Sequence, residues 1–422
     1  MAPNTWLVAG LRTPFARVDG ALMSLDAVAL SVPVAQAMAA QLAAGDRPDL
    51  LVWGAVMPNL GVSNIAREVV LDAKLAPATP AFSTVMACST SMAAVFEASG
   101  LLGADIGVAL CGGAESMSRV QLGLTQGLSD WIRRLTQART VGQRLDRATE
   151  LRWRDVRLHI PSVTNRATGR SMGEHCEDMA RQWGVGRAEQ DRVALASHQR
   201  AVTAMATGFF DDLVIAVAGA TRDGLPRADT SERKLASLAP AFDRASGKGT
   251  ITAGNASALT DGAAAIWVAS DAGLARLPQG RPRVRLADRE IAAVDIASEG
   301  LLMAPAYAIA RLLSRNALTL EAIDLWEIHE AFAAQVLCNV AALESESFLR
   351  EKAGLAGGLG RFPWDRANPN GGSIALGHPF GATGARILSQ AVKELAAMGS
   401  GKRAIVSICA DGGLGTVALL ES

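Results

Sequence analysis

Two parts of the chain repeat one order of elements, and this repeat constrains the fold more than any other feature. Apolar strands are predicted at 83–88 and 106–111, with an Ala- and Met-rich helix at 90–102 between them and a Gly-Gly pair after them. Near the end, a predicted helix at 381–397 precedes an apolar strand at 404–409, which a Gly-Gly pair also follows. Strand, helix and strand in this order favour a parallel crossover unit. The repeat therefore predicts a duplicated α/β core.

Composition excludes several classes of protein. Half of the 422 residues are hydrophobic, 19% are charged, and 41 basic side chains balance 41 acidic ones. Such apolar content excludes a disordered chain, and a net charge of zero argues against a general nucleic-acid binder. No signal peptide or membrane-spanning run is visible, and five cysteines, an odd number, argue against a disulfide framework. We expect a reduced cytoplasmic protein of bacterial type or, as the second choice, an organelle-matrix protein.

The region between the two halves, residues 121–255, has a different composition. Ten arginines and three acidic residues lie between positions 131 and 170, a local net charge of +7. Such a segment is either a solvated helical face or a site for CoA phosphates, an anionic membrane or a partner chain. We predict an N-terminal half at 1–120 completed by about 256–278, an inserted loop domain at 121–255, and a C-terminal half at 279–422.

Cys88 is the first candidate catalytic residue. It lies where the predicted strand at 83–88 meets the helix that follows. A thiol at a helix N-terminus faces free N–H groups and the positive end of the helix dipole, and both lower its pKa. A strand-to-helix turn also places the side chain where open α/β sheets bind ligands. The alternative is a buried structural cysteine.

His378 lies in a glycine-rich loop with a defined shape. Residues 368–384 contain five glycines and two prolines, and His378 stands between Gly377 and Pro379. An imidazole with so little neighbouring bulk can take a proton from a nucleophile or donate to an oxyanion. The alternative is a histidine whose hydrogen bonds are satisfied within a structural turn.

Two further residues follow predicted strands. Cys409 ends the last core strand, close to a glycine-rich turn, so it is either a second proton-transferring thiol or a small core residue. His329 follows a strand and is expected to open a helix, from which it could donate a hydrogen bond to a developing oxyanion. Position 333 is alanine rather than a second histidine, so we predict no metal site. Cys111 and Cys338 are expected to pack in the core.

The ordered motifs of the chain resemble the thiolase family over nearly its whole length. The segments that carry the resemblance are 12–15, 85–89, 112–118, 197–201, 252–257, 261–264, 377–379 and Cys409. The resemblance implies the thiolase fold, with two βαβαβαββ halves in a layered α-β-α-β-α arrangement and a loop domain inserted in the first half.

The resemblance also implies a 3-ketoacyl-CoA thiolase, with CoA as substrate and no permanently bound cofactor. Cys88 would attack the 3-keto carbonyl, and His378 would activate it. His378 and His329 would hold the first oxyanion, and Cys409 would protonate the leaving acetyl-CoA and then deprotonate incoming CoA. The second oxyanion hole would consist of the backbone N–H groups of Cys88 and Asp411. The CoA contacts implied by motif position are Ser257 and Met172.

Asp411 departs from the family pattern, which commonly has a small residue there. Its carboxylate is predicted to repel a thioester oxyanion or to raise the pKa of Cys409.

Other features resemble one branch, the thiolase subunit of β-oxidation trifunctional complexes. These features are His329 in place of the usual Asn, the arginine-rich stretch and an insertion at about 345–366. The family resemblance implies a homodimer or homotetramer, and the branch implies a hydratase/dehydrogenase alpha subunit as partner. We predict that the arginine-rich stretch at 131–170 contacts an acyl-CoA, an anionic membrane or this partner.

Three alternatives to this function remain at the level of sequence. One is an acetoacetyl-CoA thiolase working in the synthetic direction, which would use the same residues. Another is a catalytically silent acyl-CoA-binding protein, against which the intact Cys88, His378 and Cys409 argue. A ketoacyl-ACP synthase shares a Cys-His-His core, but decarboxylative condensation needs no second thiol such as Cys409.

Overall fold

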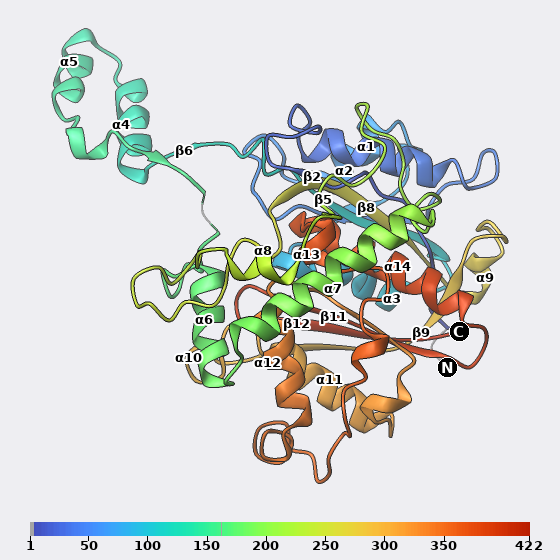
Figure 1. The fold of residues 1–422 in the computed structure, drawn as a ribbon. Coiled ribbons are helices and arrows are strands. Elements are labelled where there is room, and N and C mark those ends of the chain that lie inside the picture. The colour runs from blue at the N-terminus through green and yellow to red at the C-terminus, as the bar shows by residue number, and fades with distance from the viewer. Residues whose placement is uncertain (1–3, 162) are drawn as a thin grey trace.

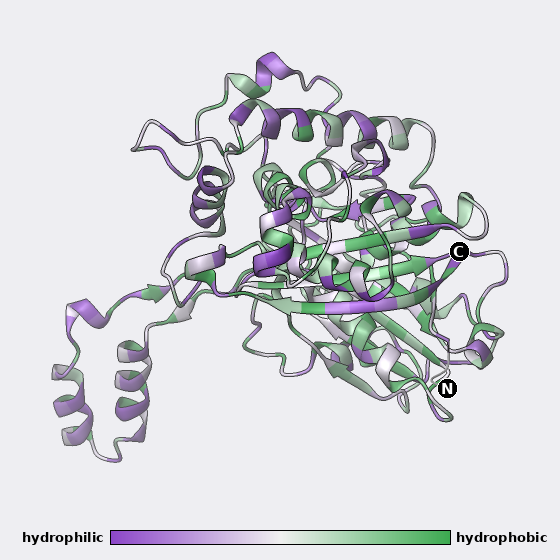
Figure 2. Ribbon diagram, turned by 90° about the horizontal axis from the view of Figure 1, so that it is seen from below, coloured by the Kyte–Doolittle hydropathy of each residue, from purple (hydrophilic) through white to green (hydrophobic). Residues whose placement is uncertain are grey.

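The most apolar segments form a ten-stranded mixed sheet in the computed structural model, which describes residues 4–161 and 163–422. Figure 2 shows these strands as the mainly hydrophobic centre of the molecule. Residues 1–3 lie outside the described residues. The predicted lack of a signal peptide concerns this end of the chain and stays a prediction. The strands are β1 (Trp6–Val8), β2 (Ala16–Arg17), β3 (Leu50–Gly54), β4 (Ala81–Ser83), β5 (Val108–Glu115), β8 (Thr260–Ala269), β9 (Arg283–Ala293), β10 (Leu325–Ile328), β11 (Arg403–Ala410) and β12 (Leu414–Glu421).

The strand order confirms the predicted duplication. The sheet runs β10-β11-β12-β9-β1-β8-β5-β3-β4, with β2 paired to β8 off this path. β3-β5-β8-β1 and β10-β11-β12-β9 are therefore the same arrangement in two copies. In each copy the first pair is parallel and the next two are antiparallel. The copies meet where β1 pairs antiparallel with β9.

Helices separate and cover the two copies, as predicted for a five-layer fold. α3 and α14 pack against each other between the two halves of the sheet. α1 and α2 cover the outer face of the first half, and α11 and α12 lie on the second half (Figure 1). These helices are α1 (Ala27–Ala39), α2 (Ile65–Asp72), α3 (Thr90–Leu101), α11 (Ala304–Arg315), α12 (Ala333–Glu344) and α14 (Thr383–Ala397).

The second half differs from the first in one strand. The first half reads βαβαβαββ from β1 to β8, as the resemblance implies. In the second half, a single parallel bridge between Trp326 and Ala367 stands in the position that β4 has beside β3. The two halves also contain the short helices α9 (Asp271–Leu274), α10 (Ile296–Glu299) and α13 (Ser373–Leu376).

The segment between β5 and β8 contains the predicted loop region. α6 (Met172–Gln182), α7 (Arg187–Ala206) and α8 (Glu232–Ala236) pack near the core, whereas α4 (Gln126–Gln137) and α5 (Val141–Thr149) form a hairpin. The hairpin stands away from the body on the two-stranded arm β6 (Gly123–Leu124) and β7 (Leu158–His159) (Figure 1). Neither α4 nor α5 contains a buried residue. Among the described residues, no helix combines the length and apolarity needed to cross a membrane.

Two predicted strand ends are wrong. The strand predicted at 83–88 ends at Ser83, because the chain then turns, and Ala87 has a φ of 44°. The Gly112-Gly113 pair lies inside β5 rather than after it. A Cβ on Gly112 would lie 2.4 Å from Cζ3 of Trp53, and one on Gly113 would lie 2.1 Å from the carbonyl oxygen of Gly381. These glycines therefore permit close backbone approach within a strand.

We predict that Gly113→Ala destabilises the protein, because the added methyl group meets backbone atoms that cannot move independently. The expected cost in the free energy of unfolding is about 1–3 kcal/mol, typical of overpacking, measured by urea unfolding. Gly142→Ala is the control: it lies in α5, and nothing would come within 4 Å of its new Cβ. The control should be neutral or stabilising by up to about 1 kcal/mol. Equal stability of the two variants would contradict the packing argument.

Candidate active site

The residues predicted to carry the chemistry come together at one cavity. The cavity has a volume of about 270 Å³. Its lining includes all but one of the predicted site residues: Cys88, Met172, Ser257, His378, Cys409 and Asp411. The remaining one, His329, lies directly behind this lining. One ligating atom each of Cys88, His329 and His378 lies within 4.8 Å of the other two. Segments from both halves of the fold thus meet at this point.

A sharp turn presents Cys88 to the cavity. Cys88 lies in a single 3-10 turn, Ala87–Ser89, immediately before α3, and it is partly exposed. The preceding Ala87 has a positive φ, a conformation that costs a residue with a Cβ about 1–2 kcal/mol. The buried Thr90 stabilises the turn: its hydroxyl accepts from the Met86 N–H at 2.9 Å and donates to the Ala87 carbonyl at 2.8 Å. Strain held in this way is typical of functional turns.

The predicted lowering of the Cys88 pKa is wrong. Burial and, to a smaller extent, the Asp411 carboxylate raise the pKa of the thiol to about 12. The backbone N–H groups of Asp411 and Cys88 point toward the sulfur and lower its pKa, but they do not outweigh these two causes. The N–H groups that lower the pKa thus belong to Cys88 itself and to the turn after β11, rather than to the first turn of α3. Cys88 rests as a neutral thiol.

His378 is a buried, neutral imidazole. Burial and, to a smaller extent, the nearby Arg386 guanidinium lower its pKa to about 3. Its Nδ1 lies 2.6 Å from the hydroxyl oxygen of Thr383. The preceding Gly377 has a φ of 95°, so the loop needs glycine at this position. The shaped loop predicted from sequence thus holds the ring by its inner nitrogen and leaves Nε2 toward the cavity.

His329 follows β10 as predicted, but it does not open a helix. α12 begins only at Ala333, because the backbone of 331–333 pairs with that of 255–257 instead of turning into a helix. Glu330 accepts hydrogen bonds from the Ser197 hydroxyl at 2.7 Å and from the Asn368 amide at 2.6 Å. The His329 ring is fully buried, and its centroid lies 4.2 Å from that of His378. Burial lowers the pKa of His329 well below its ordinary value, with further contributions from His378 and Arg386.

Both imidazoles have one nitrogen without a partner in the protein. The Nε2 atoms of His329 and His378 are buried and make no hydrogen bond within the described residues. Buried polar atoms are normally paired, so two such atoms beside a thiol indicate a place for a ligand's polar group. The Cys88-His329-His378 group could also contact a metal. The three ligand atoms lie within 4.8 Å of one another, whereas atoms bound to one zinc ion lie about 3.5 Å apart, so this spacing alone does not define a zinc site. The absence of a metal site stays a prediction.

Cys409 lies near the end of β11, and Asp411 directly follows the strand. Burial raises the pKa of the Cys409 thiol well above its ordinary value, and the neighbouring Cys88 adds to this. The carboxylate of Asp411 affects Cys88 and is not a cause of the Cys409 shift, unlike the sequence-based expectation. Instead, Asp411 accepts a hydrogen bond of 2.7 Å from the side-chain amide of Asn165. It thereby fastens the loop that leads to α6 over the cavity.

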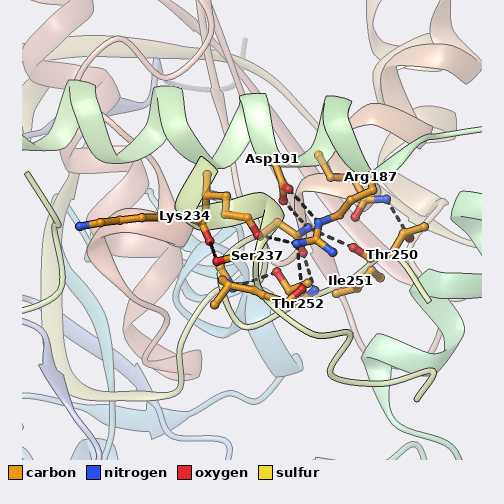
Figure 3. Close-up of polar contacts among 12 residues, drawn as sticks. Arg187, Asp191, Lys234, Ser237, Thr250, Ile251 and Thr252 are labelled. Carbon is orange, nitrogen blue, oxygen red and sulfur yellow. Dashed lines mark hydrogen bonds and ion pairs between the residues drawn. The ribbon is translucent and has the colours of Figure 1, made fainter. Parts of the chain in front are cut away.

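A polar network fixes the segment that carries Ser257. Arg187 and Asp191 on α7 form an ion pair of 2.8 Å (Figure 3). Asp191 also accepts from the Asn255 amide at 2.9 Å. The same amide of Asn255 donates to the Thr250 carbonyl at 3.2 Å. This network holds 250–257 against α7. The Ser257 N–H then donates to the Ala331 carbonyl at 2.9 Å, next to the His329 loop.

Several apolar lining residues were missed at the level of sequence. They are Val56, Met57, Phe242, Leu302, Phe332 and Phe380. Phe332 and Phe380 adjoin motifs that carry site residues, which could have indicated them. The positions of Phe242 and Leu302 depend on distant packing and have no local signal. Cys111 and Cys338, predicted as core residues, are buried as expected.

Comparisons with known proteins agree with this geometry. Residues 5–272 match the family model described as thiolase, N-terminal domain, and residues 281–422 match thiolase, C-terminal domain. The chain is 38% identical over 423 residues to a 3-ketoacyl-CoA thiolase of Yersinia enterocolitica, covering 98% of this chain and 96% of that protein.

Solved structures show the same similarity over the whole length. An acetyl-CoA acetyltransferase of Bacillus anthracis is 29% identical, with a TM-score of 0.79 and coverage of 100% of this chain and 99% of that one. A thiolase of Ascaris suum in complex with coenzyme A is 28% identical, with a TM-score of 0.81 and coverage of 99% and 100%. The human mitochondrial 3-ketoacyl-CoA thiolase is 26% identical, with a TM-score of 0.79 and coverage of 100% and 99%. With the two matched models spanning nearly all of its residues, the chain belongs to the thiolase family.

Proposed function

We propose that the chain is a 3-ketoacyl-CoA thiolase of fatty-acid β-oxidation. It cleaves a 3-oxoacyl-CoA with CoA to give acetyl-CoA and an acyl-CoA shortened by two carbons. The observation that carries the proposal is the cavity that combines Cys88, His378 and Cys409. The similarity to proteins named 3-ketoacyl-CoA thiolase supports the same reaction.

In the first half of the reaction, Cys88 attacks the 3-keto carbonyl. Because thiol and imidazole are both neutral at rest, the proton moves to His378 Nε2 as the S–C bond forms. His378 and His329 stabilise the oxyanion of this step. Breaking the C–C bond leaves an acyl group on Cys88. The N–H groups of Cys88 and Asp411, which point toward the sulfur, form the oxyanion hole for the next attack on the thioester.

Cys409 moves protons in both halves. Its raised pKa keeps it a thiol, as required for protonating the carbanion of the departing acetyl-CoA. The resulting thiolate then removes the proton from incoming CoA, whose sulfur attacks the acyl-Cys88 intermediate. CoA enters as a substrate, with Ser257 and Met172 beside its pantetheine. Covalent catalysis of this type gives ping-pong kinetics.

An acetoacetyl-CoA thiolase working in the synthetic direction is the second candidate function. It would use the same catalytic residues, and the similarity to an acetyl-CoA acetyltransferase favours it. The apolar lining by Phe242, Leu302 and Phe332 favours longer acyl chains instead. Thiolysis rates across acyl-chain lengths separate the two candidates.

We further infer a homodimer or homotetramer that pairs with a hydratase/dehydrogenase alpha subunit in the cytoplasm. β4 lies at one end of the sheet, and its free edge offers backbone hydrogen-bonding groups to another chain. Val85, two residues beyond β4, has an exposed fraction of 61%, so an apolar side chain follows this edge strand on the surface of the single chain. Sedimentation of the chain alone tests the inference, since a monomeric mass would contradict it.

We predict that Cys88→Ala lowers thiolysis by about 10⁴-fold or more, because no acyl-enzyme can form. Mass spectrometry of the wild type with substrate but without CoA should find the acyl group on Cys88. Cys338→Ala removes a buried thiol outside the cavity lining and should retain activity. Full activity in Cys88→Ala would refute the mechanism, and a folded wild type that forms no adduct would favour a silent acyl-CoA-binding protein.

We predict that Asp411→Asn shifts the pH profile of Cys88 alkylation to lower pH. The carboxylate raises the Cys88 pKa, so its removal lowers that pKa and increases the thiolate fraction at a given pH. Asn can still accept the hydrogen bond from Asn165, whereas Asp411→Ala loses both charge and acceptor. Only the alanine variant should raise KM by loosening the loop. Unchanged pH profiles in both variants would show that the side chain has no electrostatic role.

We propose that the α4–α5 hairpin makes peripheral contact with an anionic membrane. Figure 2 shows its helices as mainly hydrophilic, yet Val141 and Leu145 have exposed fractions of 74% and 64%, and Trp153, in the turn that follows α5, reaches 91%. Apolar side chains among arginines suit an interfacial position. Arg133 and Arg134 pair with Asp130 and Glu150, so other arginines are the better probes.

The test is the triple variant Arg139→Glu, Arg152→Glu and Arg154→Glu, all at exposed positions. At about 1 kcal/mol per basic residue near the surface, binding to phosphatidylserine-containing vesicles should fall by about 100-fold or more. Thiolysis of short soluble substrates should not change. Charge reversal at Lys74, Arg350 and Arg361, exposed elsewhere, is the control. Equal loss in both triple variants would refute a specific membrane contact and leave partner docking or a solvated face.

A further inference from the structure

The two active-site histidines have the same ring atom, Nε2, without a partner, although the reaction needs opposite properties from them. The rings of His329 and His378 lie side by side, and each has a buried Nε2 without a partner in the described protein. A neutral imidazole carries its proton on one nitrogen only, so its free atom is either a donor or an acceptor. Which tautomer is present follows from the partner of the other nitrogen, Nδ1.

The partner of His378 makes its Nε2 an acceptor. The Thr383 hydroxyl donates to the Pro379 carbonyl at 2.9 Å, which uses its only proton. The same Thr383 oxygen lies 2.6 Å from His378 Nδ1, and with its proton already used it can only accept a hydrogen bond from His378 Nδ1–H. The Thr383 hydroxyl then makes two hydrogen bonds. If it donated to His378 Nδ1 instead, it would lose the bond to the Pro379 carbonyl and make only one. The His378 proton is therefore on Nδ1, and Nε2 presents a lone pair to the cavity.

The partner of His329 makes its Nε2 a donor. Arg386, with an exposed fraction of 2%, donates from Nη2 to the Ser373 oxygen at 2.7 Å, and a guanidinium cannot accept. The Ser373 hydroxyl keeps its own proton, and His329 Nδ1 lies 2.8 Å away as an acceptor. A hydroxyl that donates to Nδ1 leaves the ring proton on Nε2. Arg386 and Ser373 thus form a directed chain that ends in the Nε2–H group of His329, next to His378.

We propose that Thr383 and Ser373 are positioning residues that fix the neighbouring imidazoles in opposite tautomers, His378 as an acceptor and His329 as a donor. The inference deepens the proposed thiolase function and rests on it for the catalytic consequence. Neither residue is assigned to touch the substrate. Each acts through the histidine whose Nδ1 it contacts.

The opposite tautomers complete the proton balance of the first step. The Cys88 S–H proton passes to the lone pair of His378 Nε2, and the sulfur electron pair forms the S–C bond. The carbonyl π electrons move to the ketone oxygen, which accepts a hydrogen bond from His329 Nε2–H. The imidazolium of His378 keeps its Nδ1–H bond to Thr383 throughout. If both rings were acceptors, the oxyanion would lose a donor, and if both were donors, the thiol proton would have no acceptor.

The unmodified protein provides the first test. Solid-state ¹⁵N NMR of protein labelled in its five histidines separates protonated from unprotonated ring nitrogens. His329→Gln and His378→Gln assign the two sets of signals. We expect His378 protonated at Nδ1 and His329 protonated at Nε2, both neutral at pH 7. The same tautomer in both rings would overturn the proposal, whatever the activity of the protein.

Substitution of Ser373 provides the second test. Ser373→Ala should remove the bias toward Nε2–H in His329 and lower kcat by about 10- to 100-fold with little change in KM, since an oxyanion donor is disturbed. Ser373→Thr keeps a hydroxyl and should restore both the ¹⁵N signature and kcat. Ser389→Ala, which removes another buried hydroxyl from the same part of the chain, is the control and should be active. Unchanged NMR signals and kcat in Ser373→Ala would refute its role.

Thr383 is tested by the shape-conserving Thr383→Val and the hydroxyl-conserving Thr383→Ser. The valine variant should slow alkylation of Cys88 and lower kcat by about 10-fold or more through loss of a fixed proton acceptor, while the serine variant retains both. In a His329→Ala background, Ser373→Ala should have no additional effect, because its only route is through that ring. An additive loss would mean that Ser373 acts elsewhere. A wild type without thiolysis but with the expected tautomers would refute the proposed function and leave the tautomer assignment intact.

Discussion

The close approach of two backbones near the middle of the molecule is the constraint on which the site depends. A Cβ on Gly113 of β5 would lie 2.1 Å from the Gly381 carbonyl oxygen, and one on Gly384 would lie 2.4 Å from the Met92 nitrogen of α3. Only glycine permits these contacts. They bring the start of α14 against the start of α3, so that His378 and Cys88, from different halves, can meet. Duplication supplies two similar halves, and the glycines determine how closely they join.

Behind this junction lies a second constraint, a buried cluster of charge. Arg386 is nearly enclosed, and Glu327, Glu330 and Glu394 lie around it. Burial raises the pKa of Glu327 and of Glu394, the latter to about 7, so the pair does not carry two full charges at neutral pH. Buried charges are tolerated when paired and hydrogen-bonded. The cluster keeps Arg386 ionised beside both imidazoles. Its positive charge favours the neutral forms of His329 and His378, and its Nη2 group donates to Ser373.

Local patterns predicted most elements of the core and the residues that gather at the cavity, because strand, helix and glycine signals are properties of adjacent residues. The helix after Cys88, the strand before Cys409 and the duplicated order are of this kind. The wrong predictions concern effects between distant residues. Gly112 and Gly113 lie inside β5 and not after a strand. The neighbours that require glycine there, Trp53 and Gly381, are far away in the sequence and give no local signal. The Cys88 pKa depends on burial and on Asp411, and Asp411 is held by a residue 246 positions away.

These effects combine into one consequence for reactivity. A resting thiolate would require a site that favours charge on both Cys88 and His378, but burial disfavours both charged forms. An ion pair of Cys88 thiolate and His378 imidazolium is therefore costly in free energy until a ketone oxygen beside His329 can take up the negative charge. Nucleophile formation is thus linked to bond formation rather than preceding it. A cysteine activated only together with its substrate is less exposed to unwanted oxidation and alkylation, which depend on the thiolate fraction.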